Sequence, residues 1–377
     1  MSIPLRRSWP SFARYIGIAL VGCSSSSGAH GASGGPDAGG GDGTSTTPPP
    51  ADDAGNPDTD TGAVATPDSG SSGTDRFPAS SIIYEDVSNA TLDPNSTAII
   101  NNLATVGWGS GNFQIDFSLT ILHADSSVTP RAFTPASGYY TPDCDMTTVP
   151  IPPGGNAEGQ TNYTCDTSQG DCHVLVYQGT RLYELYNTTI AGGTATGSPF
   201  TTLCEVVWDL THDYWQPGTP YSRGDQCTSA DAAGMPIAPL LVTGADLEAG
   251  VVNHAMRFTL PNSSIKSGVY VHPGTHAGGP SGGNLMPPYV ARFRLKSSYD
   301  VSSLPNAAAK AVATALQKYG MFLDDGGNIP LTFDASAAAY LGSHDLFGIN
   351  VSDFEIVASP DPAVTLTDNC TRTPVTN

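Results

Sequence analysis

The sequence has few charged residues, and few of those are basic. Only 13% of its 377 residues are charged, and 15 Lys and Arg stand against 35 Asp and Glu, a formal net charge of -20. Binding nucleic acid requires clustered Lys and Arg to neutralise phosphates. This balance therefore argues against a nucleic-acid partner. The 42 Gly and 31 Pro follow no G-X-Y period, which excludes a collagen-like fibre.

No hydrophobic run near the N-terminus is long enough to cross a bilayer as a helix. The apolar residues 16–21 follow Arg6, Arg7 and Arg14 and end at Cys23. A positive region before a short apolar run is typical of a targeting segment that is removed after export. We therefore expect residues 1–22 to be a signal peptide.

The four residues Leu20-Val21-Gly22-Cys23 resemble the lipobox of bacterial lipoproteins. In that family the cysteine is acylated and becomes the mature N-terminus. The resemblance implies lipidation of Cys23 and contact with the membrane through the lipid anchor only. In a Gram-negative host, Ser24 would favour the outer membrane or the cell surface by the same analogy. An ordinary secretory signal with a chance cysteine is the alternative.

The segment after Cys23 lacks Phe, Trp, Tyr, Lys and Arg. Residues 24–74 are rich in Gly, Ser, Asp, Pro and Thr and contain no Lys or Arg. Such a stretch cannot bury enough apolar surface to offset the entropy of ordering. We expect a disordered tether over residues 23–76. Since no internal linker or repeat follows, residues 77–377 are predicted to form a single β-rich globular domain.

No pair of cysteines has the C-x2-C spacing of a zinc-thiolate site. An even number in an exported chain predicts up to three disulfides instead. We favour a Cys204–Cys227 bond, with Cys370 joining a cysteine of the 144–172 group, although the sequence leaves the connectivity open. Beyond Cys23 the cysteines are Cys144, Cys165, Cys172, Cys204, Cys227 and Cys370.

Period-two alternation dominates the folded region, and helical patterns are scarce. Apolar residues alternate with polar ones in 113–121, which predicts a half-buried strand. One main helix is expected at about 305–319, between Pro305 and Gly320. We predict a β-sandwich or jelly-roll-like domain. Further strands are expected at 173–177, 181–186, 204–210, 254–260, 268–271 and 289–295, the last with Arg292 and Arg294 facing outward.

Three acidic residues near strand ends or among aromatics are candidate catalytic groups: Glu184, Asp209 and Asp231. Glu184 shares a strand face with Leu182 and Tyr186, where an acid is unexpected. Burial among aromatics raises the pKa of a carboxyl, which a general acid requires. Two such carboxyls beside a sugar would make a glycosidase. Alternatively, these acids cap turns or bind structural Ca2+.

Aromatic residues concentrate with polar ones in 208–223, which predicts an exposed loop facing a ligand. Trp208, Tyr214, Trp215 and Arg223 are the candidate substrate-binding residues there. Aromatic faces beside polar groups suit sugar rings, although core and rim packing explains the same composition.

Two loop histidines, His272 and His276, are further candidates. They could bind substrate, act in acid–base chemistry, hold a metal, or bond only to the backbone. The acidic segment 324–328 resembles a Ca2+ loop but lacks EF-hand spacing, so a turn is expected. No cofactor is predicted beyond a possible structural Ca2+.

A series of motifs resembles an uncharacterised family of exported bacterial proteins. The resemblance covers residues 173–330 and implies a single domain, but it transfers no activity and no catalytic residues. The motifs are Trp208-Asp209-Leu210, then C-T-S-A-D-A-A-G-M-P-I at 227–237, H-A-M-R-F at 254–258 and K-Y-G-M at 318–321.

Three functions fit these observations. The first is a cell-surface polysaccharide hydrolase with paired carboxylates. The second is a non-catalytic module that binds a glycan or a partner, and the third is a metal-dependent hydrolase built on His272 and His276. The acidity argues against anionic polysaccharides, unless a local basic patch of Arg257, Arg292 and Arg294 faces the ligand.

Overall fold

A computed structural model of the chain describes residues 76–168, 170–215 and 223–376. The predicted signal peptide, Cys23 and nearly all of the predicted tether lie outside the described residues, as do residues 216–222 of the aromatic-rich segment. All described residues belong to one compact unit. Within them, no helix has the length and apolarity needed to cross a membrane.

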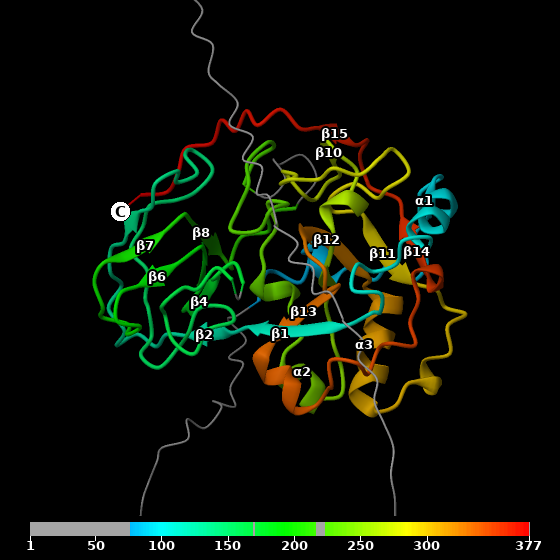
Figure 1. The fold of residues 1–377 in the computed structure, drawn as a ribbon, viewed down its shortest axis with the longest axis horizontal. Helices are drawn as coiled ribbons and strands as arrows, with labels where there is room; N and C mark the ends of the chain where they lie inside the picture. Colours follow the sequence, from blue (N-terminus) through cyan, green and yellow to red (C-terminus); the bar gives the residue numbers. More distant parts are fainter. Residues whose placement is uncertain (1–75, 169, 216–222, 377) are drawn as a thin grey trace, which may run out of the picture. The chain divides into compact units, whose positions relative to one another are not determined.

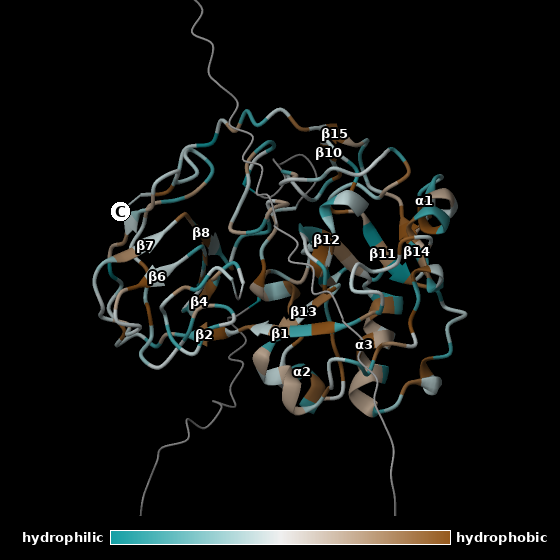
Figure 2. Cartoon of the chain, viewed as in Figure 1, coloured by the Kyte–Doolittle hydropathy of each residue, from teal (hydrophilic) through white to brown (hydrophobic). Residues whose placement is uncertain are grey.

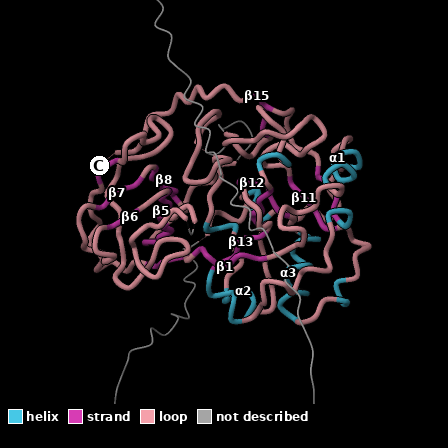
Figure 3. The backbone as a smooth tube through the Cα atoms, viewed as in Figure 1, coloured by secondary structure: helices cyan, strands magenta, loops and turns pink. Residues whose placement is uncertain are grey.

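The described chain is mostly β with one main helix, which confirms the predicted class. Figure 3 shows short strands joined by long loops. The largest sheet has six strands in the order β1-β13-β9-β12-β11-β14, with β1–β13 and β9–β12 parallel. Its strands are β1 (Ile115–Leu119), β9 (Met256–Leu260), β11 (Arg292–Leu295), β12 (Met321–Gly326), β13 (Leu331–Asp334) and β14 (Phe354–Val357).

A second sheet has four strands in the order β2-β4-β5-β8. The strands predicted at 173–177 and 181–186 are confirmed, and they form the antiparallel pair β4–β5. Its strands are β2 (Ile121–His123), β4 (Val174–Gln178), β5 (Arg181–Tyr186) and β8 (Cys204–Asp209). Two small sheets contain β3 (Thr134–Pro135), β6 (Thr189–Ile190) and β7 (Phe200–Thr202), and β10 (Val269–Tyr270) with β15 (Val364–Thr365).

The main helix is α3 (Ala307–Lys318), which packs against β11 (Figure 1). Its first turn is capped by Asn306, whose side chain accepts a hydrogen bond from the Ala309 N–H at 2.8 Å. Gly320 follows at φ +68°. The other α-helices are α1 (Ser96–Leu103) and α2 (Gly244–Glu248). Single-turn 3-10 helices are η1 (Ile82–Tyr84), η2 (Ala238–Leu240), η3 (Asn262–Ser264), η4 (Val301–Ser303), η5 (Ala335–Ala339) and η6 (Val351–Asp353).

Both large sheets contribute to one main hydrophobic core. Leu182 and Trp208 of the four-stranded sheet belong to the same buried cluster as Phe258, Phe293 and Phe333 of the six-stranded sheet. Burying large aromatic side chains contributes most of the free energy of such a core. The two sheets therefore stabilise each other.

The prediction that Arg292 and Arg294 face outward is wrong. Both are buried, because β11 lies between β12 and β14 and residues 85–90 cover that face of the sheet. Figure 2 shows part of β11 coloured as hydrophilic. Arg294 donates to Glu355 at 2.8 Å through Nε, so the buried charge is paired.

Six cysteines form three disulfides: Cys144–Cys204, Cys165–Cys172 and Cys227–Cys370. The predicted number is confirmed, but both favoured pairings are wrong: Cys204 bonds to Cys144, and Cys370 bonds to Cys227 and not to a cysteine of the 144–172 group. Residues 144–145 run beside β8, where the Asp145 N–H donates to the Glu205 carbonyl at 2.7 Å, and this places Cys144 next to Cys204. Three disulfides fit an extracellular or periplasmic protein.

Candidate functional site

A buried cluster of charges surrounds Arg257 in the middle of the six-stranded sheet. Nη2 of Arg257 lies 2.8 Å from Asp231 Oδ2 and 3.5 Å from Asp325 Oδ2, and Nε lies 3.1 Å from Asp324 Oδ2. Nη1 donates to Thr332 Oγ1 at 3.1 Å. Three carboxyl groups thus meet one guanidinium.

Sheet topology explains this arrangement. Arg257 lies on β9, and the two neighbouring strands, β12 and β13, supply three of its four partners. Consecutive side chains of a regular strand point to opposite faces. Here the β9–β12 register shifts between Leu323 and Asp325. A local irregularity of this kind re-aims side chains, which is how both Asp324 and Asp325 reach Arg257.

The cluster carries more carboxyl groups than its single cation neutralises. Burial raises the pKa of Asp231, Asp324 and Asp325, and the neighbouring carboxylates add to the effect on Asp231 and Asp324. Asp324 Oδ1 has no hydrogen-bond partner among the described residues. Such a set holds protons more tightly than exposed carboxylates do, which is the property a general acid needs.

The three carboxyls differ in their access to solvent. The side chains of Asp231 and Asp324 are 0% exposed, whereas that of Asp325 is 20% exposed. Asp325 Oδ1 accepts a hydrogen bond from the Gly326 N–H at 2.7 Å. Asp325 is therefore the member of the cluster that a solute can approach.

A second buried charge pair holds the loop that carries Asp231. Nδ1 of His173 lies 2.8 Å from Glu158 Oε2, and Nε2 lies 3.0 Å from the carbonyl oxygen of Ala230. Burial alone would lower the pKa of His173, but the Glu158 carboxylate outweighs it and raises the pKa to about 9. The imidazolium thus donates to the residue immediately before Asp231.

Of the predicted catalytic residues, only Asp231 lies in this cluster. Glu184 is fully buried in β5 and accepts hydrogen bonds at 2.8 Å from Trp208 Nε1 and from the N–H groups of Ile237 and Ala238. Burial raises the pKa of Glu184. It anchors the far end of the Asp231 loop and has no exposed oxygen.

Asp209 lies at the exposed end of β8, outside the carboxyl groups that contact Arg257. Its Oδ1 accepts from the Thr211 hydroxyl at 2.7 Å and the Thr211 N–H at 2.9 Å. These hydrogen bonds lower the pKa of Asp209. A lowered pKa suits a turn cap and does not suit a general acid.

The aromatic side chains predicted to bind substrate are mostly buried. Trp208 is 0% and Trp215 is 6% exposed, so the exposed loop expected there is absent for these two residues. Phe77 explains this, because its ring contacts Trp208, Tyr214 and Trp215 edge to face at centroid distances of 6.2, 5.9 and 5.2 Å. Tyr214 is half-buried, and its hydroxyl accepts the Asp209 N–H at 3.0 Å.

The side chain of Arg223 is buried and also faces protein. Its Nη2 donates to Asp145 Oδ2 at 2.7 Å, and its guanidinium lies 5.8 Å from the Trp208 ring centroid. Arg372 donates to the other oxygen of the same carboxylate at 2.7 Å. Arg223 therefore belongs to a structural ion cluster.

The structure does not bring His272 and His276 together on a shared ligand. His272 lies between two carboxylates, with Nε2 2.9 Å from Asp225 and Nδ1 3.2 Å from Asp361. His276 contacts the Ala232 carbonyl at 2.9 Å and Asp368 at 3.4 Å. All four ring nitrogens have protein partners.

Within the described ranges, one group of three metal-ligand side chains lies close together: Asp143, Cys227 and Cys370. Its two sulfurs form a disulfide, which leaves a single carboxylate as a potential ligand. The turn predicted at 324–328 begins late, because β12 continues through Asp324 and Asp325 to Gly326.

Sequence reasoning missed the His173–Glu158 pair and the grouping of Asp324 and Asp325 with Arg257. The basic patch considered at Arg257, Arg292 and Arg294 does not form on the surface, because all three side chains are buried. A signal was present, since Arg257 interrupts an apolar strand and two adjacent acids end another. Comparisons with protein-family models, curated proteins and solved structures found no match.

Proposed function

We propose that the protein is an exported hydrolase of polysaccharides that uses the carboxyl groups at Arg257. The observation that carries this proposal is that Asp231 and Asp325 contact the same nitrogen, Nη2 of Arg257, while only Asp325 is partly exposed. Glycoside hydrolysis uses two carboxyls near the scissile bond, one of them protonated. The raised pKa values support the presence of a protonated group.

In this proposal Asp325 meets the glycosidic oxygen or the anomeric carbon, because it is the accessible member. Asp231 is the second carboxyl of the proposed pair, and Arg257 is a positioning residue that influences the charge state of both. The His173–Glu158 pair holds the Asp231 loop through Ala230. The neutral glycans are the favoured substrates, because the chain carries a net charge of -20.

The test is hydrolysis of a panel of neutral polysaccharides by the full chain, measured as newly released reducing ends. Asp325→Asn should reduce the rate by at least about 100-fold, the usual loss for an acid–base group. Asp209→Asn, at an exposed turn, should retain the wild-type rate. The proposal fails if no polysaccharide is cleaved, or if Asp325→Asn cleaves as well as wild type does.

A non-catalytic glycan-binding module is the second candidate. The complete burial of Asp231 and Asp324 favours it, since a ligand reaches only the Asp325 edge unless the loop moves. Binding of a glycan without release of reducing ends, weakened by Asp325→Asn, would support the module over the hydrolase.

We also propose that a lipid on Cys23 anchors the protein at the outer membrane or cell surface. The lipobox resemblance supports the anchor, and the three disulfides fit the location. Labelling with a fatty acid should depend on Cys23, and the Cys23→Ala variant should no longer be found in the membrane fraction. Equal labelling of the variant would contradict the anchor.

A further inference from the structure

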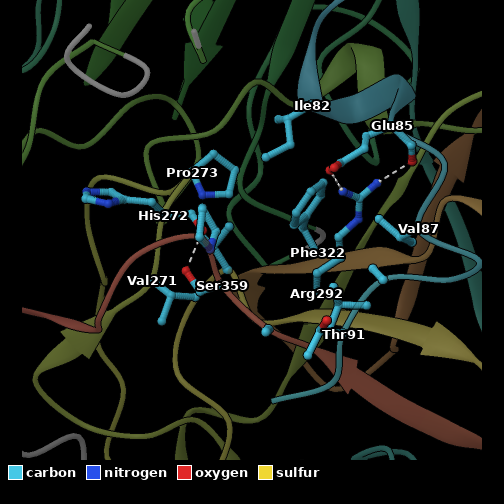
Figure 4. Close-up of a pocket in the computed structure, with 15 residues that line it drawn as sticks. Ile82, Glu85, Val87, Thr91, Val271, His272, Pro273, Arg292, Phe322 and Ser359 are labelled. Atoms are coloured by element: carbon cyan, nitrogen blue, oxygen red, sulfur yellow. Dashed lines mark hydrogen bonds and ion pairs between the residues drawn. The ribbon is translucent and has the colours of Figure 1, made fainter. Parts of the chain in front are cut away.

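A pocket of about 210 Å3 lies at the edge of the six-stranded sheet, and Arg257 is not among the residues that line it (Figure 4). Residues from three segments, 82–91, 271–273 and 357–360, line the pocket. Arg292 of β11, Phe322 of β12 and Val290, which lies just before β11, complete its wall. This volume holds several water molecules or one small organic molecule. Most wall side chains are apolar, so the pocket favours a compact apolar body.

One full charge lies buried in this apolar wall. The Arg292 side chain is 7% exposed, and its guanidinium stacks on Phe322 at 4.8 Å from the ring centroid. Nε donates to the Tyr319 carbonyl at 2.9 Å, Nη1 to Glu85 Oε2 at 2.8 Å and Nη2 to the Glu85 carbonyl at 3.0 Å. A guanidinium has five N–H donors, so among the described residues one hydrogen on each terminal nitrogen is left for another acceptor.

The two partners of this ion pair differ in burial. The Glu85 side chain is 57% exposed, whereas Arg292 is nearly inaccessible. An exposed carboxylate is well solvated and gains little from an ion pair. The buried guanidinium, in contrast, requires an anion beside it. A second carboxylate that enters the pocket can therefore replace the Glu85 side chain while Arg292 keeps its neutralising partner.

The backbone of the pocket wall is strained at one residue. Val290 has φ +64°, which is unfavourable for a β-branched side chain. It is held by a 2.7 Å hydrogen bond from its N–H to the Leu323 carbonyl. Gly274 makes room for it, since a Cβ there would lie 2.2 Å from Val290 Cγ2. Strain of this kind concentrates at ligand-binding walls.

We propose that this pocket binds small monocarboxylates with a compact, branched apolar body. The ligand carboxylate replaces the Glu85 side chain on Nη1 of Arg292 and accepts the remaining hydrogen of Nη2, while the apolar body contacts Val271, Pro273 and Val357. The Thr91 and Ser359 side chains also line the pocket. In Figure 4 the His272 ring points away from Arg292, so the imidazole takes no part. The proposal is independent of any activity at Arg257.

The charge of the whole chain sets the expected affinity. With a net charge of -20, the molecule repels anions at long range. We therefore expect modest affinity that increases with ionic strength at low salt, because salt screens the long-range repulsion more than the buried contact with Arg292.

The experiment titrates the full chain with isovalerate and, separately, with the uncharged isovaleramide, by calorimetry or NMR. Isovalerate should bind more tightly than the amide. Glu85→Gln removes the competing carboxylate at an exposed position and should tighten isovalerate binding by roughly five-fold, the equivalent of one ion pair. The affinity for the amide should stay unchanged in this variant.

Two further variants test whether the binding depends on Arg292. Arg292→Gln should abolish the preference for the acid over the amide. The matched control is Glu355→Gln, which removes the carboxylate partner of Arg294 two residues along β11 and outside the pocket. It should bind isovalerate as wild type does. Equal affinities for acid and amide, no gain in Glu85→Gln, or no binding at all would each overturn the proposal.

Discussion

At the residue scale, the His173–Glu158 pair links the two sheets. His173 precedes β4, and through Ala230 it holds the loop that presents Asp231 to β9. Burial would raise the pKa of Glu158, but the His173 imidazolium outweighs it and lowers the pKa to about 2. The pair is therefore charged over the neutral range.

This pair predicts a fall in stability at alkaline pH. The folded pKa of His173 is raised from 6.5 to about 9. Its stabilisation is therefore complete below about pH 6.5 and is lost as the pH rises through about 9, by an amount on the order of 3 kcal/mol. In the Glu158→Gln variant, the free energy of unfolding should depend much less on pH between about 6.5 and 9. Urea denaturation across this pH range measures it.

The exposed His212→Gln variant is the control and should keep the wild-type fall. A Glu158→Gln profile that falls as steeply as wild type would show that the pair does not stabilise the folded state.

At the element scale, the loop between β8 and α2 depends on one glycine. Gly234 has φ +77°, and a Cβ there would lie 2.0 Å from Thr275 Oγ1. That hydroxyl donates to the Cys227 carbonyl at 2.8 Å. The loop that carries Asp231 therefore packs against the 272–276 segment with no room for a side chain.

Gly234→Ala should destabilise the protein by at least about 3 kcal/mol, because it combines a left-handed backbone with the loss of a buried hydrogen bond. Gly250→Ala is the matched variant, since Gly250 has φ +71° and no atom within 4 Å of its Cβ position. It should cost only about 1–2 kcal/mol. Thermal or urea unfolding measures both, and equal costs would refute the packing argument.

The strands and helices that the sequence predicted well are those with local signals. The 181–186 strand follows from its local pattern, and the 305–319 helix follows from Pro305 and Gly320 at its ends. Arg292 and Arg294 were predicted to face outward, because alternating polar and apolar residues are typical of a strand with one face in solvent. In this strand both faces are covered. The covering segment 85–90 lies some two hundred residues earlier, and no local pattern reports it.

In the candidate site, too, features that depend on local sequence could be predicted, and features that depend on distant contacts could not. Burial of Glu184 follows from its position between apolar neighbours, and the structure confirms that it is buried. The convergence of Asp231 with Asp324 and Asp325 depends on strand order and on a register shift, which are non-local. Candidate acids are thus recognisable in the sequence, but their grouping is not.

At the scale of the whole molecule, the disulfides close loops of very different length. Cys227–Cys370 spans 143 residues, whereas Cys165–Cys172 spans 7. A crosslink restricts the unfolded chain more when its loop is longer. The C-terminal segment is held further by Arg372, whose Nη2 donates to the buried Asp145 at 2.7 Å.

Replacing both members of each disulfide with Ala should therefore have unequal effects. The loop-entropy relation gives a loss of about 5 kcal/mol for the Cys227–Cys370 bond and about 2 kcal/mol for the Cys165–Cys172 bond. Denaturant unfolding of the two double variants measures the difference. The opposite order would show that native-state contacts outweigh the restriction of the unfolded chain.

The attachment of the C-terminal segment also constrains the order in which the molecule is completed. Cys227 is synthesised long before Cys370, which lies 143 residues later in the chain. The Cys227 thiol therefore has no native partner until Cys370 has been added. During that interval Asp145 has only Arg223 as a cation, because Arg372 arrives later still. The Cys227–Cys370 bond and the contact of Arg372 with Asp145 therefore form only after synthesis is nearly finished.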